Sequence, residues 1–309
     1  MKTYQHLFGP VPSRRMGLSI GVSPIPRKCC NYSCIYCQLG RTNKLTNIRQ
    51  SFFDLQEILN EFKDYLKEEI KFDVVTVVGE GEPTLYKDLK ELIMGLKELT
   101  TKPVAVITNG SLLHEENVRE ALYEADIVLP SFDSYDKESF KKIDRPFGKI
   151  KYEDVYEGLM VFSKEYKGEL WIETMMIKNI NDHEEALLKM KDLLKNINYD
   201  RLYINTPVRP PAERWVEAAS KESIKQAVNL LGGISIDMLH SEGFFSEEKD
   251  DYKAILSIIK RHPMNQYEID TFLKSRKCEK IEEIFEALKK DENVEVIDYK
   301  GYITYRYQS

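Results

Sequence analysis

Hydrophobic and polar residues alternate along the chain with two periods, one typical of helices and one of strands. Between residues 51 and 70 the apolar residues recur every three or four positions, as in an amphipathic helix. The run DVVTVV at 73–78 follows, and its β-branched residues are typical of a strand buried on both faces. The same succession of helix and strand continues to about residue 206. This pattern predicts an α/β fold built from βα units.

Six strands are predicted in this region, with helices between most of them. The predicted strands cover 18–23, 73–78, 104–108, 126–132, 170–177 and 201–206. The predicted helices cover 51–70, 86–98, 115–123, 136–165 and 182–195. Parallel strands need crossover helices, so we expect a partial (βα)6 TIM-like barrel with ligands at the carboxyl ends of its strands.

The end of the chain follows a different pattern. A polar stretch at 240–251 predicts a domain boundary near residue 245, which divides the chain into domains 1–245 and 246–309. Three helices are predicted at 252–261, 265–273 and 279–290, followed by two alternating strands. This order resembles a small winged helix-turn-helix domain. Residues 250–309 hold 11 Lys and Arg against 12 Asp and Glu, so we expect no binding to duplex DNA.

Composition and charge narrow the possible partners. The chain has 309 residues, of which 42% are hydrophobic, and its apolar runs are too short to cross a bilayer, so we expect no membrane partner. No signal peptide is predicted from the first ten residues, which favours a cytoplasmic location. The net charge is -6, yet residues 1–50 contain Lys and Arg and no Asp or Glu. These cations either offset a negative metal site or contact a phosphate-bearing substrate such as RNA.

Four of the five cysteines fall within nine residues, and three of them, Cys30, Cys34 and Cys37, fit a Cys-x3-Cys-x2-Cys pattern. Such a group in a reducing compartment indicates a metal or redox site rather than disulfides. Three thiolates would leave one iron of a 4Fe-4S cluster open to a small ligand. Three alternatives remain: a zinc site completed by histidines or Cys278, a fourth ligand from Cys29, and unmodified thiols.

The cysteine spacing resembles the signature of the radical S-adenosylmethionine (SAM) superfamily. The resemblance implies a 4Fe-4S cluster on Cys30, Cys34 and Cys37, SAM as the second cofactor, and an external flavodoxin- or ferredoxin-like electron donor. The segment GEGEPTL at 79–85 resembles the Gly-Gly-Glu-Pro loop of the family, although Glu80 stands where the first glycine is usual.

Further SAM contacts are implied at successive strand ends. The segment ITNGSLL at 107–113 resembles the Thr-Asn-Gly segment of the family that lies near the ribose. The cofactor-binding residues implied by the resemblance are Tyr36, Gly81, Glu82 and Asn109. The segment PSFDS at 130–134 closes the fourth strand, where we expect Ser131 and Asp133 to reach the ribose hydroxyls; the alternative for Asp133 is a helix N-cap.

A narrower resemblance covers most of residues 7–216. The segments FGPVPSRRMGLSIGV, CIYCQLGRT, GEPTL, FKKIDRP and NTPVRPPAERW look like the radical SAM group named after wyosine (tricyclic guanosine) synthase of tRNA. That family carries a second cluster on further upstream cysteines, and no cysteine precedes Cys29 in this chain. The resemblance therefore implies SAM chemistry without the second cluster.

The resulting hypothesis is an enzyme that cleaves SAM reductively and forms a 5'-deoxyadenosyl radical, which acts on an unidentified substrate. RNA or another phosphate-bearing molecule is the candidate substrate class. Candidate substrate contacts are Arg14, Arg15, Glu173, Asn205 and Arg209, and no catalytic acid or base is singled out. One alternative is an activase that installs a glycyl radical on a partner protein. An alternative of another class is a cluster-containing regulator that senses SAM or redox state.

Overall fold

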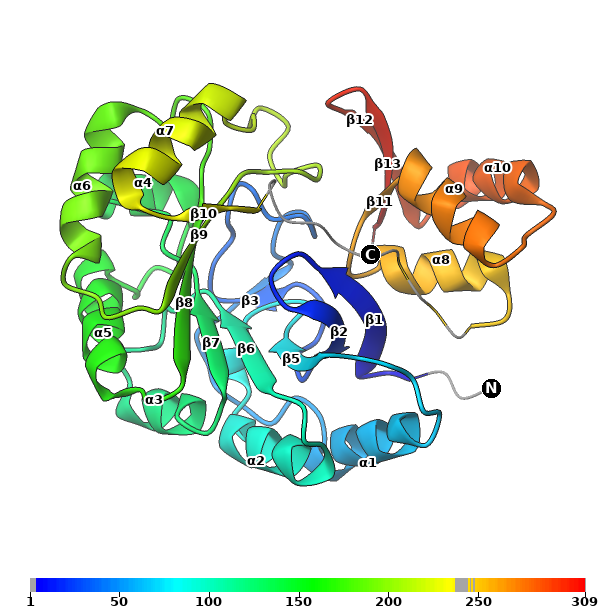
Figure 1. The fold of residues 1–309 in the computed structure, drawn as a ribbon, viewed down its shortest axis with the longest axis horizontal. Helices are drawn as coiled ribbons and strands as arrows, with labels where there is room; N and C mark the ends of the chain where they lie inside the picture. Colours follow the sequence, from blue (N-terminus) through cyan, green and yellow to red (C-terminus); the bar gives the residue numbers. More distant parts are fainter. Residues whose placement is uncertain (1–3, 237–243, 245, 247, 309) are drawn as a thin grey trace.

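The computed structural model describes residues 4–236, 244, 246 and 248–308. Its main sheet has eight strands in the order β1-β2-β5-β6-β7-β8-β9-β10 (Figure 1). All six predicted strands are present and parallel: β2 (Gly17–Val22), β5 (Val74–Val78), β6 (Val104–Thr108), β7 (Ile127–Pro130), β8 (Glu169–Met175) and β9 (Arg201–Asn205). The predicted α/β fold with a parallel sheet is confirmed.

Two further strands extend the sheet at its edges. Strand β1 (Leu7–Ser13) pairs antiparallel with β2, and β10 (Ile234–Ser235) pairs parallel with β9. Neither strand is predicted by the hydrophobic pattern, because β1 contains two prolines and an irregular register and β10 is only two residues long.

The alternating residues of a strand face two different cores. In β5, Val75 and Val77 pack in the large hydrophobic core with the helices, whereas Val74 packs in a smaller core with Ala105 and Ile127. This alternation follows from the pleat of the strand. A sheet with apolar residues on both faces explains why these strands read as continuous hydrophobic runs.

The helices of the main unit lie outside the curved sheet, as Figure 1 shows. They are α1 (Leu55–Leu66), α2 (Leu89–Leu99), α3 (Glu116–Leu122), α4 (Lys137–Ile143), α5 (Tyr152–Glu165), α6 (Glu184–Leu194) and α7 (Lys221–Leu231). Helix α1 begins later than the predicted 51–70 because the Asp54 carboxylate accepts hydrogen bonds from the amides of Gln56 and Glu57, an N-cap. Short elements complete the unit: β3 (Cys29–Cys30), β4 (Lys44–Leu45) and a 3-10 turn, η1, at Pro83–Leu85.

The C-terminal unit, from α8 to β13, has its own hydrophobic core (Figure 1). Its elements are α8 (Asp251–Ile259), β11 (Met264–Asn265), α9 (Gln266–Ser275), α10 (Ile281–Lys290), β12 (Val294–Tyr299) and β13 (Tyr302–Tyr307). The three strands form a sheet in the order β11-β13-β12. The predicted boundary at residue 245 lies outside the described residues.

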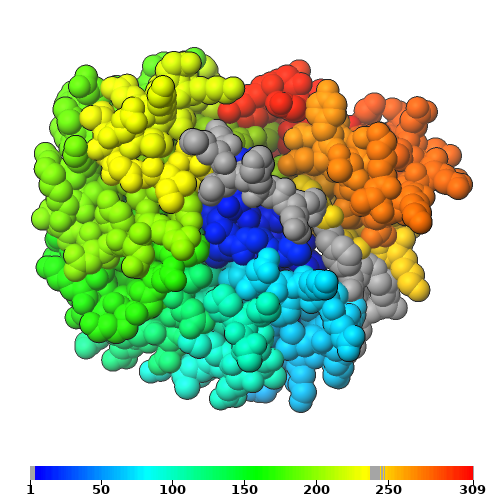
Figure 2. Space-filling model, viewed as in Figure 1, coloured from blue at the N-terminus to red at the C-terminus, as the bar shows by residue number. Residues whose placement is uncertain are grey.

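The two units meet around the N-terminal strands. Figure 2 shows this blue segment at the centre of one face, between the yellow region of α7 and the orange C-terminal unit. Within the described residues, no helix is both long and apolar enough to span a membrane. The N-terminal strands therefore lie next to both units, where side chains from each can reach a common site.

Candidate active site

A cavity of about 810 Å³ is bounded by the strands of the main sheet on one side and by the C-terminal unit on the other. Ten of the predicted site residues line it: Arg14, Arg15, Cys30, Cys34, Tyr36, Cys37, Gly81, Glu173, Asn205 and Arg209. The C-terminal unit contributes residues of α9, including Tyr267, Thr271 and Ser275. Residues far apart in the sequence thus line one concave cavity, which is the usual form of a small-molecule site.

The cysteine loop is anchored to the C-terminal end of α4. The amide of Ile35 donates to the carbonyl of Ile143 (2.9 Å) and the amide of Ser33 to the carbonyl of Asp144 (3.0 Å). The side chains of Ile35 and Ile143 are buried in the same hydrophobic cluster. The loop between Cys30 and Cys37 is therefore fixed by backbone hydrogen bonds and by packing.

The three predicted ligands face the cavity, and burial raises the pKa of the Cys30, Cys34 and Cys37 thiols. Nearby cations, including Arg306 and Lys28, oppose this effect at Cys37. Soft thiol donors on one loop that face one cavity suit an iron-sulfur cluster, whose irons displace the thiol protons. Within the ranges that the structure describes, no three His, Cys, Asp or Glu side chains are arranged around a single metal ion, as the zinc alternative would need.

Gly81 brings the predicted SAM loop against the cysteine loop. A Cβ at this position would overlap the carbonyl oxygen of Cys29, so the close approach needs a glycine. The same carbonyl accepts a hydrogen bond from the amide of Glu82 (3.2 Å). Cys29 is buried and does not line the cavity, and its carbonyl joins the two loops.

Glu82 holds the ends of β5 and β6 together. One oxygen of its buried carboxylate accepts hydrogen bonds from the hydroxyls of Thr84 and Thr108 (both 2.6 Å), and the other accepts one from the amide of Asn109 (2.8 Å). Burial raises the pKa of Glu82, and these hydrogen bonds act in the opposite direction. Glu82 does not line the cavity, and its contacts give it a positioning role.

The predicted ribose contacts lie beside the large cavity. Asn109, Ser131 and Asp133 line a smaller cavity of about 30 Å³, and Tyr32 lines both cavities. The Asp133 carboxylate accepts hydrogen bonds from the Tyr36 hydroxyl and from the amide of Met175, the latter at 2.6 Å. Both of its oxygens are therefore occupied by contacts that tie the cysteine loop to β8.

Three predicted substrate contacts form one polar wall. Arg15 makes an ion pair with Glu173, and the side-chain amide of Asn205 donates to Glu173 Oε1 (3.2 Å). Burial lowers the pKa of Arg15 to about 10, so its guanidinium stays protonated at neutral pH. Arg14 also lines the cavity. The ends of β8 and β9 thus place a cation, an anion and an amide next to each other.

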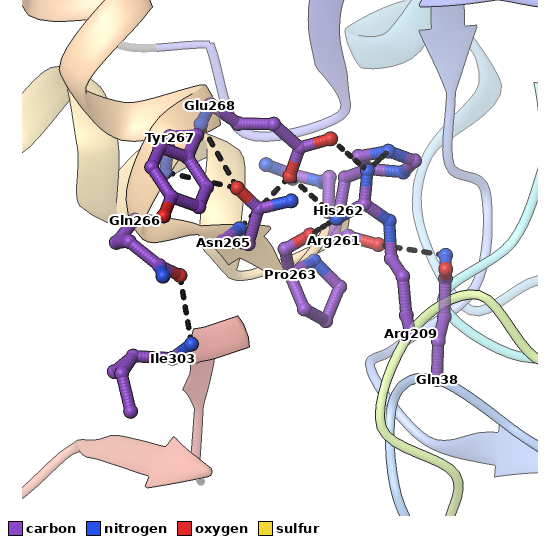
Figure 3. A network of polar contacts seen from close by, with 10 residues as sticks. All are labelled: Gln38, Arg209, Arg261, His262, Pro263, Asn265, Gln266, Tyr267, Glu268 and Ile303. Atoms are coloured by element: carbon purple, nitrogen blue, oxygen red, sulfur yellow. Dashed lines mark hydrogen bonds and ion pairs between the residues drawn. The ribbon is translucent and has the colours of Figure 1, made fainter. Parts of the chain in front are cut away.

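Arg209 lines the cavity, but its guanidinium forms hydrogen bonds with residues of the C-terminal unit (Figure 3). Its guanidinium donates to both carboxylate oxygens of Glu268 (3.0 Å each) and to the carbonyl of Pro263. It also donates to Nε2 of His262 (2.6 Å). Burial, followed by nearby arginines including Arg209, lowers the pKa of His262 well below its usual value, so the imidazole is neutral and can accept this bond.

An ion-pair network that was not predicted from the sequence lies behind the cysteine loop. The buried Glu213 carboxylate accepts two hydrogen bonds from Arg41 (2.9 Å each) and pairs with Arg145. The amide of Glu213 also donates to the carbonyl of Ile35 (3.0 Å). These residues lie in the segments LGRT, KIDRP and PPAERW, whose shared resemblance to one family was the signal available in the sequence.

A comparison with protein families decides the assignment. The family model described as "Radical SAM superfamily" matches residues 25–190. This chain belongs to the radical SAM superfamily. It is a radical SAM enzyme that uses a 4Fe-4S cluster and SAM, as predicted, rather than only a regulator.

Its relatives include a UPF0026 protein of Methanocaldococcus jannaschii, 36% identical over 276 residues that cover 86% of this chain and 85% of that protein. A protein of Brachyspira hyodysenteriae named GTPase Obg is 40% identical over 72% of this radical SAM chain, which spans 33% of that protein's length. A structure of TYW1 with a lysine-pyruvate adduct bound has a TM-score of 0.53 at 21% identity, covering 69% of this chain and 72% of that one. This likeness shows a shared fold.

Proposed function

We propose that this enzyme cleaves SAM reductively at a cluster held by Cys30, Cys34 and Cys37, and that the reaction serves a substrate bound in the 810 Å³ cavity. A 4Fe-4S cluster held by these three cysteines would supply the one-electron chemistry, with the electron drawn from a flavodoxin- or ferredoxin-like donor, that cleaves SAM into methionine and a 5'-deoxyadenosyl radical. One observation carries the proposal: these three thiols and Gly81 line the same cavity as the polar wall of β8 and β9.

Two different groups of cavity residues would bind SAM and the substrate. Gly81 leaves its backbone open to the SAM amino group, and Tyr36 lies at the cavity wall with its hydroxyl bonded to Asp133. Arg15, Glu173 and Asn205 would bind polar groups of the substrate. The C-terminal unit forms the other side of the cavity and would limit the access of water to the reacting atoms.

The substrate class that we propose is a phosphate-bearing molecule, RNA included, acted on in the cytoplasm. Support comes from Arg14 and Lys28, which line the cavity and belong to a segment without acidic residues. We further propose that the main sheet is a partial (βα)6 barrel and that residues 246–309 form a winged-helix domain. The element order helix, strand, two helices and two strands supports the second assignment.

The test is the release of 5'-deoxyadenosine from anaerobically reconstituted protein that is reduced with dithionite in the presence of SAM. We expect formation of 5'-deoxyadenosine and methionine by the wild type and none by Cys34→Ala. Cys278→Ala is the matched control, because this cysteine lies in the C-terminal unit and does not line the cavity. A wild type that contains its full iron and forms no 5'-deoxyadenosine would contradict the proposal.

A further inference from the structure

Glu80, the residue that departs from the family's glycine, lies between two arginines. Its carboxylate is 3.6 Å from Nε of Arg27 and 3.3 Å from Nε of Arg261. The three side chains, which we call the Glu80 cluster, are only 12% to 15% exposed. Charges this well buried are costly to leave unpaired, so the cluster strongly favours a single arrangement.

The members of the Glu80 cluster come from three segments. Arg27 precedes the cysteine loop, Glu80 opens the loop that contains Gly81, and Arg261 follows α8 of the C-terminal unit. The cluster therefore joins the two loops of the cofactor site to a unit more than 170 residues away in the sequence. Figure 3 shows Arg261 next to His262 and Pro263, which contact Arg209.

Both arginines are held by further contacts. Arg27 donates to the carbonyls of Lys260 (3.1 Å) and Tyr307 (2.6 Å). Arg261 donates to the carbonyl of Gln5 (3.1 Å), and its guanidinium lies 4.9 Å from the centre of the Phe8 ring. The guanidinium groups are thus fixed in place independently of Glu80, and they can set the position of its carboxylate.

The position of the Glu80 backbone determines that of Gly81. The carbonyl of Glu80 accepts a hydrogen bond from the amide of Lys28 (2.5 Å), and its amide donates to the hydroxyl of Ser23 (3.3 Å). Gly81, the next residue, packs against the carbonyl of Cys29. A displacement of the Glu80 side chain would therefore shift the peptide that faces the cofactor site.

We propose that Arg261 is a positioning residue for SAM: acting through Glu80, it fixes the loop at Gly81, so that the C-terminal unit contributes to SAM affinity. The proposal rests on the proposed function, because it assumes that SAM binds at Gly81. It gives the C-terminal unit a role in the cofactor site as well as in the wall of the cavity.

Removing Arg261 and removing the charge of Glu80 should not have equal effects on the Glu80 cluster. Without Arg261, Glu80 still pairs with Arg27. Without the Glu80 charge, two buried guanidinium groups face each other with no anion between them, which is the less favourable case. Glu80→Gln should therefore weaken SAM binding more than Arg261→Met.

The experiment measures the dissociation constant of SAM on reconstituted variants, together with their iron content. We expect about fivefold weaker binding for Arg261→Met and more than about tenfold for Glu80→Gln, with iron unchanged. Arg276→Met is the matched control. Arg276 is 19% exposed, bonds to Asp251 at 2.6 Å and lies over the Phe272 ring, all within the C-terminal unit, so SAM affinity should not change.

Hydrogen exchange of the backbone amides of residues 79–82, measured without SAM, guards against a general folding defect. We expect faster exchange there in Arg261→Met and no change in Arg276→Met. Unchanged SAM affinity in Arg261→Met would overturn the inference. An equal loss of SAM affinity in Arg261→Met and in the control Arg276→Met would overturn it as well. A wild type that does not bind SAM would instead refute the proposed function, while the exchange measurement would still test the contact through Glu80.

Discussion

The two walls of the cavity are built in different ways. The strand-end wall is held by short side chains and backbone groups, such as those around Glu82, with hydrogen bonds between neighbouring strands. The C-terminal wall is held by long arginine side chains that reach across to the other unit, such as Arg27 and Arg209. Short buried groups have few alternative arrangements, whereas arginines retain many rotamers when a contact is lost. We therefore expect a substitution among the short groups of the strand-end wall to disturb the cavity more than a substitution among the arginines of the C-terminal wall.

The largest effect is expected at Cys34, one of the three proposed cluster ligands. Cys34→Ala should lose the iron-sulfur cluster, because only Cys30 and Cys37 would then remain to hold it. Cys29→Ala is the control and should keep the cluster, since Cys29 does not line the cavity. Iron content and the visible absorption of reconstituted protein check both. Equal loss of iron in the two variants would show that the ligand set is wrong.

The next effect is expected at Gly81. Gly81→Ala places a Cβ against the carbonyl of Cys29, and the loop must move, which should weaken SAM binding by roughly 100-fold. Gly148→Ala is the matched control, because a Cβ there meets nothing within 4 Å. Equilibrium binding of SAM checks the pair. If Gly81→Ala bound SAM as the wild type does, the strand-end wall would be more adaptable than its contacts indicate.

A smaller effect, on stability, is expected at Glu213. Glu213→Gln should lower the free energy of unfolding by about 1.5 kcal/mol at pH 7, because Arg41 and Arg145, which are 72% and 38% exposed, lose their shared anion but remain hydrated. Hydrogen bonds from Arg41 and, to a lesser extent, from Arg145 lower the pKa of Glu213 despite its burial. The carboxylate therefore stabilises the fold above the unfolded pKa of about 4.3, and this stabilisation is lost as the pH falls through the lower folded pKa.

Urea unfolding of wild type and variant at pH 7 and at about pH 3 tests this, and the two proteins should converge at the acidic pH. Glu217→Gln is the control, because Glu217 is 66% exposed in its pair with Lys178 and should change stability by less than about 1 kcal/mol. A gap between wild type and Glu213→Gln that persists unchanged at low pH would contradict the role of the charge.

The smallest effect is expected for duplex DNA and the C-terminal unit. Several basic side chains near the predicted third helix are paired with acids, among them Lys274 with Asp270 and Lys280 with Glu283. Replacing Lys274 and Lys277 by Ala should change the affinity of the full chain for random duplex by less than about twofold at low salt. A clear loss of affinity together with a weaker salt dependence would show that this unit contacts DNA.

Local patterns predicted most of the fold and only part of the site. The six parallel strands follow from β-branched runs whose burial depends on neighbouring residues in the chain. The proposed cluster ligands likewise come from the spacing of three cysteines within one short loop. Glu213 could not be found this way, because its contact with Arg41 spans 172 residues. A local sequence pattern does not show which residues this far apart in the chain lie in contact.

Arg209 illustrates the same limit from the other side. It follows a strand end, where a substrate contact is expected, and it does line the cavity. Its donors are nonetheless taken by Glu268, Pro263 and His262, which belong to a separately predicted domain. The place of a residue after a strand predicts that its side chain lies near the cavity. The packing of the two units determines which groups that side chain contacts.

The arginine contacts between the units have a consequence for how the protein can change in evolution. Arg27 donates hydrogen bonds to the backbone carbonyls of Lys260 and Tyr307, and Arg306 donates to those of Pro210 and Pro211. Every amino acid offers the same carbonyl group, so these bonds survive most substitutions at the accepting positions. Side chains of the C-terminal unit that face the cavity and take no part in contacts between the units, such as Tyr267 and Thr271, can thus diverge while the unit stays attached. One catalytic scaffold could in this way acquire new substrates by drift in its last sixty residues.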